Sequence, residues 1–216
     1  MTVRERIEIA AAALRKNNMD VYCVDTKEQV AAQVAALLHE GDTVAVGGSQ
    51  SLDETGVIDL LRSGDYRFLD RYVPGLTREQ LREIYVESFS ADAYLCSSNA
   101  VTLRGELYNV DGNANRVAAM CFGPRSVILV VGCNKLVADL DEAAQRVKTA
   151  AAPLNTKRLH CATYCEEKGV CMAADGEFCT DGCASPARIC CTYVTMGYQR
   201  ETHRIKVILV GEPLGF

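Results

Sequence analysis

The chain has 216 residues, of which 49% are hydrophobic and 24% charged, and its formal net charge is −5. A chain of this length can bury one large core, so we expect a single domain over residues 1–216 and no nucleic-acid or anionic-membrane partner, since both require a basic surface. No run of about 18 apolar residues and no secretory signal is present, which predicts a cytoplasmic protein without a membrane span.

The first half of the chain alternates helices with short strands. Residues 3–17 carry apolar side chains at helical spacing, and residues 21–24 follow as a strand. Thr26 and Gln29 form a capping box that opens the next helix, which continues to Leu38. A strand at 43–46 leads into the glycine turn Gly47-Gly48-Ser49, and a helix is expected over 55–61. Thr77 caps a further helix, which continues to Phe89.

The second half continues this pattern. Four apolar strands are expected between residues 92 and 136: Tyr94–Cys96, Leu107–Val110, Val117–Cys121 and Val127–Val131. A helix starts at Asp139 and breaks at Pro153, and a last strand covers residues 205–210. Alternating strands and helices predict an α/β fold with an open mixed, mostly parallel sheet that helices cover on both faces. The closely spaced strands from residue 107 to 131 predict one antiparallel excursion.

Small polar residues and glycines follow the predicted strand ends. The ligand crevice of an open α/β sheet lies outside the carboxyl ends of its strands, so we expect these residues to form a ligand site. The candidate residues are Gly47, Gly48, Ser49, Ser51, Ser98, Asn99, Thr102, Asp111, Gly112, Asn115, Arg116, Asn134 and Lys135.

Each candidate also has a purely structural interpretation. Ser51 and Glu54 can form a capping box, which explains both residues without a ligand and leaves Glu54 a weak candidate for a catalytic nucleophile. Asp111-Gly112 is typical of a hairpin turn. Arg116 offers two parallel donors to an anion but can equally form a salt bridge with an acidic residue, whereas Lys135 supplies a point charge.

Eleven cysteines are unusual for a chain of this length, and seven of them lie between residues 161 and 191. In a reducing compartment such a cluster predicts metal binding rather than disulfides. Residues 160–203 are therefore expected to form a cysteine-rich metal-binding insertion, called the cysteine-rich segment below. A [4Fe–4S] cluster, a zinc ion and free thiols all remain open. Cys23, Cys96, Cys121 and Cys133 are expected to be core residues.

Several blocks of sequence resemble the bacterial lactate-utilisation (LUD) domain family. The central block is SSNAVTLRGELYNVDGNANRVAAMCFGPRSVILVVGCNKLV, and further likeness lies in GGSQSLDETG, RVKTAAAPLNTKRL, SPARIC and RIKVILVGEPLGF. The resemblance implies a sheet related to the CoA-transferase and ribose-phosphate-isomerase folds. It also implies metal ligands at Cys165, Cys171, Cys183 and Cys190, with Cys161, Cys179 and Cys191 as alternates. Tyr164, where the family has proline, and the eleven residues between Cys171 and Cys183 depart from its pattern.

Two functions are compatible with these features. The resemblance implies a subunit or accessory enzyme of lactate oxidation to pyruvate, which would bind a small carboxylate or its CoA or phosphate derivative and act with iron–sulfur partner subunits. The alternative is a non-catalytic electron-transfer or assembly module that holds an iron–sulfur cluster or zinc. The sequence contains no NAD or flavin motif, since GGSQSLDETG does not match G-x-G-x-x-G. A homodimer is compatible with either function.

Overall fold

The computed structural model describes all residues from Met1 to Phe216. Its centre is a six-stranded sheet in which every neighbouring pair is parallel. The strands, in spatial order, are β1 (Asp20–Val24), β10 (Ile205–Val210), β7 (Ser126–Gly132), β4 (Ala93–Cys96), β2 (Thr43–Val46) and β3 (Arg67–Leu69). The predicted parallel α/β sheet is thus confirmed.

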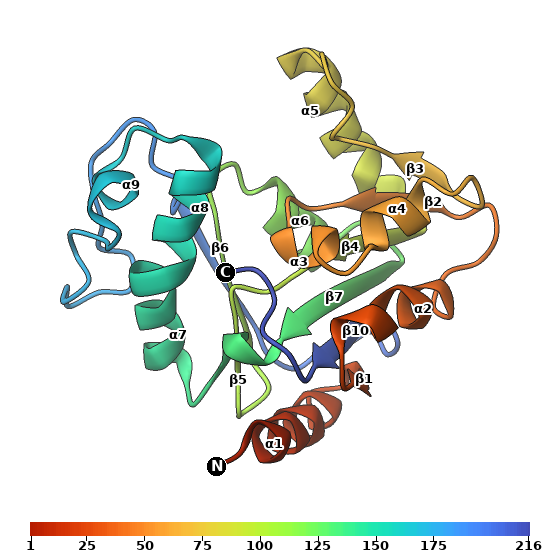
Figure 1. Cartoon of the computed structure of the whole chain (residues 1–216), viewed down its shortest axis with the longest axis horizontal. Coiled ribbons are helices and arrows are strands. Elements are labelled where there is room, and N and C mark those ends of the chain that lie inside the picture. Colours follow the sequence, from red (N-terminus) through yellow and green to blue (C-terminus); the bar gives the residue numbers. More distant parts are fainter.

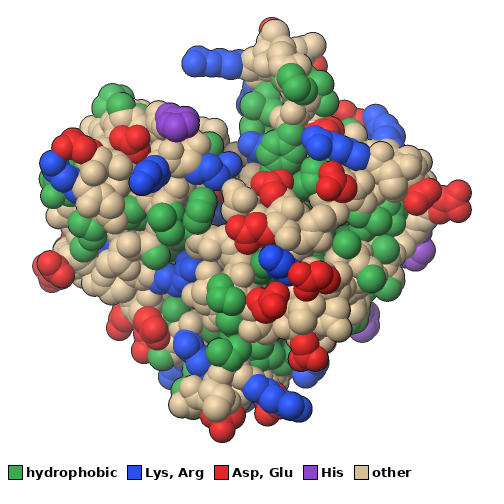
Figure 2. Space-filling model, in the orientation of Figure 1, with side chains coloured by type: hydrophobic (Ala, Val, Ile, Leu, Met, Phe, Trp, Pro, Cys, Tyr) green, Lys and Arg blue, Asp and Glu red, His purple; other side chains and the backbone are tan.

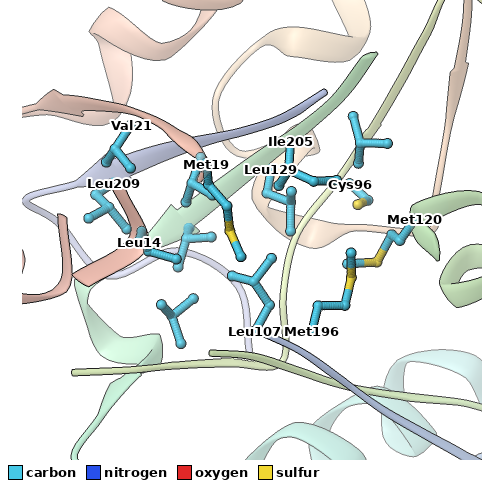
Figure 3. Packing of buried hydrophobic residues seen from close by; sticks show 14 of the residues in the cluster. Leu14, Met19, Val21, Cys96, Leu107, Met120, Leu129, Met196, Ile205 and Leu209 are labelled. Atoms are coloured by element: carbon cyan, nitrogen blue, oxygen red, sulfur yellow. The ribbon is translucent and has the colours of Figure 1, made fainter. Parts of the chain in front are cut away.

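Alternating side chains of these strands enter two separate cores. On one face, Ile128 and Ile208 pack against the helices α2 (Val30–Ala35), α3 (Gln50–Asp53) and α4 (Val57–Leu61). On the other face, Leu129 and Leu209 meet α1 (Val3–Lys16), α6 (Asn115–Cys121) and part of a second sheet (Figure 3). This period of two follows from the pleat of a strand, and it buries both faces of the main sheet.

The second sheet adds a layer that the sequence did not predict. It contains β8 (Leu136–Val137), β5 (Ala100–Thr102), β6 (Leu107–Asp111) and β9 (Thr192–Met196), in that order. The pairs of β6 with β5 and with β9 are antiparallel. They lie in this separate sheet, so the antiparallel excursion predicted between residues 107 and 131 of the main sheet is wrong. Strand β9 comes from the cysteine-rich segment, so this segment is joined to the body of the protein through a sheet.

A long helical element covers the outer face of the second sheet. It consists of α7 (Leu140–Arg146), a π-helical turn (Val147–Ala151) and α8 (Ala152–Leu159), and it packs on Tyr108 and Val110. The predicted break at Pro153 is wrong. Pro153 lies in the first turn of α8, where its missing N–H is tolerated, and the π turn continues the helical path into it.

A second correction concerns residues 117–121, which form helix α6 and not a strand. The Asp111 carboxylate at the end of β6 accepts hydrogen bonds from the backbone N–H groups of Arg116 and Val117, each at 3.1 Å. These bonds satisfy early N–H groups of the helix, so the chain turns into a helix directly after the strand. For the same reason Asp111-Gly112 is not a hairpin turn.

Helix α5 (Arg78–Glu87) projects from the body and buries none of its residues (Figure 1). Thr77 caps it as predicted. The cysteine-rich segment lies at the opposite end of the sheet edge, beside α8, and contains the short helix α9 (Tyr164–Lys168). No helix of the protein combines the length and the apolar character that crossing a bilayer requires.

Candidate active site at the carboxyl edge of the main sheet

Four neighbouring strands of the main sheet, β2, β4, β7 and β10, end at the same edge. The segments that follow them meet there and line a crevice with two connected chambers. The inner chamber, of about 110 Å³, is lined by Gly48, Ser49, Gln50, Ser97, Ser98, Asn99, Val110, Asp111, Arg116, Lys135, Ala151, Asn155, Arg158 and Phe216. Loops that are distant in the sequence therefore share one cavity.

The outer chamber, of about 380 Å³, extends from this point towards the cysteine-rich segment. Its further lining residues include Arg71, Gly112, Asn113, Asn115 and the stretch Pro186–Cys190. Figure 2 shows a hollow between the lobe that carries α8 and α9 and the projecting helix α5. One wall of the crevice thus belongs to the main sheet and the other to the cysteine-rich segment.

Arg116 is fully engaged inside the protein. Its guanidinium donates to the carboxylate of Asp111 at 2.9 Å, to Asn109 Oδ1 at 2.6 Å and to Asn99 Oδ1 at 2.9 Å. Further bonds go to the backbone carbonyls of Ser97 and Val110. The salt-bridge interpretation of this residue holds, since Asp111 is its partner at 2.8 Å. Arg116 consequently fixes the positions of the two loops that carry Asn99 and Asp111.

Lys135 has a different environment. It lies on a 3-10 turn directly after β7, it is 4% exposed, and its Nζ bonds to Ser51 Oγ at 2.9 Å and to Ser97 Oγ at 3.0 Å. No carboxylate forms a salt bridge with it. Burial, reinforced by the positive charges of Arg146 and Arg116, lowers the pKa of Lys135 to about 7.

The turn after β2 also differs from its predicted form. Ser49 precedes α3 and Ser51 lies within it, so Ser51 is not a cap but a partner of Lys135. The Glu54 carboxylate accepts a hydrogen bond from the backbone N–H of Gly215 at 2.8 Å and lies outside the crevice. Ser49 lines the inner chamber, and its buried hydroxyl has no hydrogen-bond partner within the protein.

Four of the predicted site residues lie outside both chambers, and two of these, Thr102 and Asn134, have other structural roles. Thr102 is buried in β5, where its hydroxyl contacts Glu106 and closes the turn of this hairpin. Asn134 holds the chain end, because its Oδ1 accepts from the backbone N–H of Leu214 at 3.0 Å. The remaining candidates line the crevice or, like Gly47 and Ser51, support residues that line it. Gly47 leaves room for Arg116, whose side chain would lie 3.0 Å from a Cβ at this position.

Sequence reasoning missed the arginines of the crevice. The guanidinium carbon of Arg71 lies 4.9 Å from the centre of the Tyr85 ring, and Arg158 forms hydrogen bonds only to Asn155. Neither forms a salt bridge. Both lie on helical or irregular stretches distant from the predicted loops, so no local pattern distinguishes them from surface arginines. Arg158 does fall within the block RVKTAAAPLNTKRL.

The cysteines of the cysteine-rich segment converge only in part. Five of them, Cys165, Cys171, Cys179, Cys183 and Cys190, line one apolar cavity of about 20 Å³, called the thiol pocket below. Thiols suit soft metals and clusters, so the donor chemistry fits the expected metal. However, no three His, Cys, Asp or Glu side chains of the chain converge as a metal-ligand group. The pocket therefore supplies donors without a closed ligand set.

The other cysteines and the histidines lie apart from the thiol pocket. Cys161 and Cys191 do not line it, and the exposed His203 bonds to Asp20 at 3.1 Å. Of the four cysteines predicted in the core, Cys96 is buried, whereas Cys23 and Cys121 are exposed. These two lie where a strand or helix faces solvent.

Comparison with known proteins identifies relatives of the whole chain. The family model described as the LUD domain matches residues 7–210. The crystal structure of a DUF162 family protein from Deinococcus radiodurans is similar with a TM-score of 0.53 and 17% identity, over 97% of this chain and 99% of that chain. A weaker likeness, with a TM-score of 0.37 and 20% identity, covers 54% of this chain and 44% of eIF2B beta from Chaetomium thermophilum. No curated protein matches the chain.

Proposed function

The chain belongs to the LUD domain family, and we propose that it binds a small carboxylate, or the CoA or phosphate derivative of one, in the crevice. We further propose that it acts in lactate oxidation to pyruvate as a subunit or accessory enzyme. The observation that supports a ligand most strongly is the shared cavity of the loops at Gly48, Asn99 and Asp111. A ligand would give the unpartnered Ser49 hydroxyl its missing hydrogen bond.

The charge of the crevice favours an anionic ligand. Arg71 and Arg158 carry positive charge to its walls without forming salt bridges, although the chain as a whole is acidic. A guanidinium binds a carboxylate or phosphate through two parallel hydrogen bonds. The larger outer chamber leaves space for the extended part of a CoA or phosphate derivative, and the inner chamber suits a small carboxylate.

Oxidation of lactate requires an electron acceptor, and the chain has no NAD or flavin motif. In the proposed role the acceptor is supplied by iron–sulfur partner subunits, and this chain binds and orients the organic acid. In the same proposal the protein is cytoplasmic and forms a homodimer.

Thermal unfolding in the presence of lactate, pyruvate and a CoA ester tests the ligand. We expect at least one of them to raise the melting temperature, because a molecule that binds only the folded state stabilises it. Arg158→Gln should remove most of the shift, whereas Arg200→Gln should not, since the exposed Arg200 lies outside the crevice. If no compound shifts the melting temperature, the proposed ligand class is wrong.

The thiol pocket favours a second candidate function, a non-catalytic electron-transfer or assembly module. Cys165, Cys171, Cys183 and Cys190 are the proposed ligands, Cys179 is a fifth donor on the same cavity, and Cys161 and Cys191 are alternates. A [4Fe–4S] cluster would supply one-electron transfer there, and zinc would supply a structural crosslink.

Metal analysis of protein purified without oxygen separates these cases. A brown protein that bleaches on reduction indicates a cluster, and a colourless protein with one equivalent of zinc indicates a structural ion. Cys171→Ser and Cys183→Ser should each lose the metal, while Cys23→Ser should retain it because Cys23 lies on β1. Metal-free protein with a fully ordered cysteine-rich segment would contradict this second function.

A further inference from the structure

Lys135 is a buried amine without an acidic partner. A buried ammonium group is costly unless a carboxylate compensates for it, yet its bonds go to the neutral hydroxyls of Ser51 and Ser97. The charged groups that influence it are Arg146 and Arg116, which oppose protonation, and Glu54, which favours it. As a result, a substantial fraction of the Lys135 amine is uncharged near neutral pH.

The location of this amine gives it access to a ligand. Lys135 lines the inner chamber together with Ser49 and Arg158. An anionic group of a small ligand can bind to Arg158 while another part of the same molecule reaches the amine. A neutral amine attracts an anion poorly but is a nucleophile towards a carbonyl carbon. The chamber thus combines an anion-binding group with a nucleophile.

We propose that Lys135 forms a Schiff base with a small carbonyl compound that carries an anionic group. This inference rests on the proposed function, because it assumes that the crevice binds such a ligand. The two sources of this chemistry are a 2-oxo acid and a phosphorylated ketone or aldehyde.

The step balances without an oxidant or a reductant. The lone pair of Lys135 Nζ forms a bond to the carbonyl carbon, the C=O π electrons move to oxygen, and one proton passes from nitrogen to oxygen to give a carbinolamine. The C–O bond then breaks, the oxygen takes the remaining N–H proton and leaves as water, and a C=N bond forms to give the neutral imine. The hydroxyls of Ser51 and Ser97, which both contact Nζ, can relay these protons.

Reductive trapping of the full chain tests the inference. The protein is incubated with pyruvate, or separately with dihydroxyacetone phosphate, in the presence of sodium cyanoborohydride, and is then analysed by intact mass and peptide mapping. We expect one adduct per chain, located on Lys135, with at least one of the two probes. Inorganic phosphate should suppress it by competing for the anion-binding end.

Two variants control for general lysine reactivity. Lys135→Arg should abolish the adduct. Lys206→Arg should retain it, although burial also lowers the pKa of Lys206, because this residue lies on β10 outside the crevice. Ser97→Ala should slow adduct formation several-fold through loss of the proton relay. Peptide mapping of the unsubstituted protein decides the question even if a variant fails to fold.

Thermal shifts measured with the same probes separate this inference from the proposed function. A stabilising probe that leaves Lys135 unmodified overturns the Schiff base and leaves the ligand site intact. Adducts spread over several lysines, or unaffected by Lys135→Arg, also overturn it. If neither probe binds nor reacts, the inference is rejected, whereas the proposed ligand class is rejected only if lactate and the CoA ester also fail to raise the melting temperature.

Discussion

Two arginines, one on each wall of the crevice, show how differently the main body and the cysteine-rich segment are held together. Arg116 in the body is 9% exposed and bonds to a carboxylate and two amide side chains. Arg188 in the cysteine-rich segment bonds to the backbone carbonyls of Thr180, Cys183 and Cys190 and to the hydroxyl of Tyr193. Its guanidinium forms no salt bridge.

This difference follows from the amount of apolar surface available. The body contains two large hydrophobic cores, so a largely buried ion pair can be accommodated there. Between residues 160 and 191 only Thr163 and Cys165 are buried, and a polar side chain must organise the backbone directly. We therefore expect changes in the body to affect global unfolding and changes in the segment to act locally.

The largest effect is expected for Arg116→Gln. This change leaves Asp111, whose side chain is 11% exposed, without its ionic partner, and breaking a buried pair typically costs about 3–5 kcal/mol of unfolding free energy. Urea denaturation measures the loss. The double variant with Asp111→Asn should lose less than the sum of the two single variants, because the two residues interact directly. A loss below about 1 kcal/mol would contradict the role given to Arg116.

A smaller, pH-dependent effect is expected at Lys135. Its pKa of about 7 in the folded protein lies below the unperturbed value of 10.5, so between these values the unfolded chain binds more protons. The unfolding free energy should therefore rise with pH relative to Lys135→Met, by at most about 1.4 kcal/mol per pH unit. Below about pH 7 the difference between the two proteins should become constant.

Denaturation between pH 6 and 10 measures this dependence. Lys16→Met is the matched control, because Lys16 is exposed on α1, and its profile should run parallel to that of the unsubstituted protein. If the Lys135→Met profile also runs parallel to that of the unsubstituted protein, Lys135 is protonated over the whole range from pH 6 to 10.

The smallest effect on global stability is expected for Arg188→Gln. The change removes donors from three backbone carbonyls, yet urea denaturation should detect less than about 0.5 kcal/mol, because the segment buries little apolar surface. Hydrogen exchange should instead accelerate in residues 176–191 alone. If the free energy of global unfolding falls as much as in Arg116→Gln, the two regions unfold as one cooperative unit, which contradicts the expected difference between them.

Much of the main sheet could be predicted from the sequence because its signals are local. Alternating and continuous apolar runs identify β1, β2, β4, β7 and β10, and the caps at Thr77 and Asp139 mark helix starts correctly. Helix α6 could not be predicted in this way. Its apolar stretch is equally compatible with a strand, and the decisive cap, Asp111, belongs to the preceding strand.

The site was predictable where residues directly follow strands. Ser98, Asn99 and Lys135 lie at the crevice because they follow β4 and β7, whose carboxyl ends meet at one edge of the parallel sheet, whereas Asp111 reaches it from the end of β6 in the second sheet. The roles of these residues were not predictable. The guanidinium of Arg116 has all its donors engaged in hydrogen bonds, and the amine of Lys135 has no carboxylate partner. Both properties depend on contacts between residues far apart in the chain. Arg71 enters the crevice from the turn after β3, and Arg158 enters it from α8.

The helical element from α7 to α8 has a consequence for communication across the molecule. Val147 and Ala152 line both the outer chamber and the thiol pocket, and Cys190 borders both cavities from the facing segment. The partition between the two cavities is thus a single layer of side chains. An occupant that displaces this layer from one side changes the space on the other, and any resulting coupling of affinities must be reciprocal.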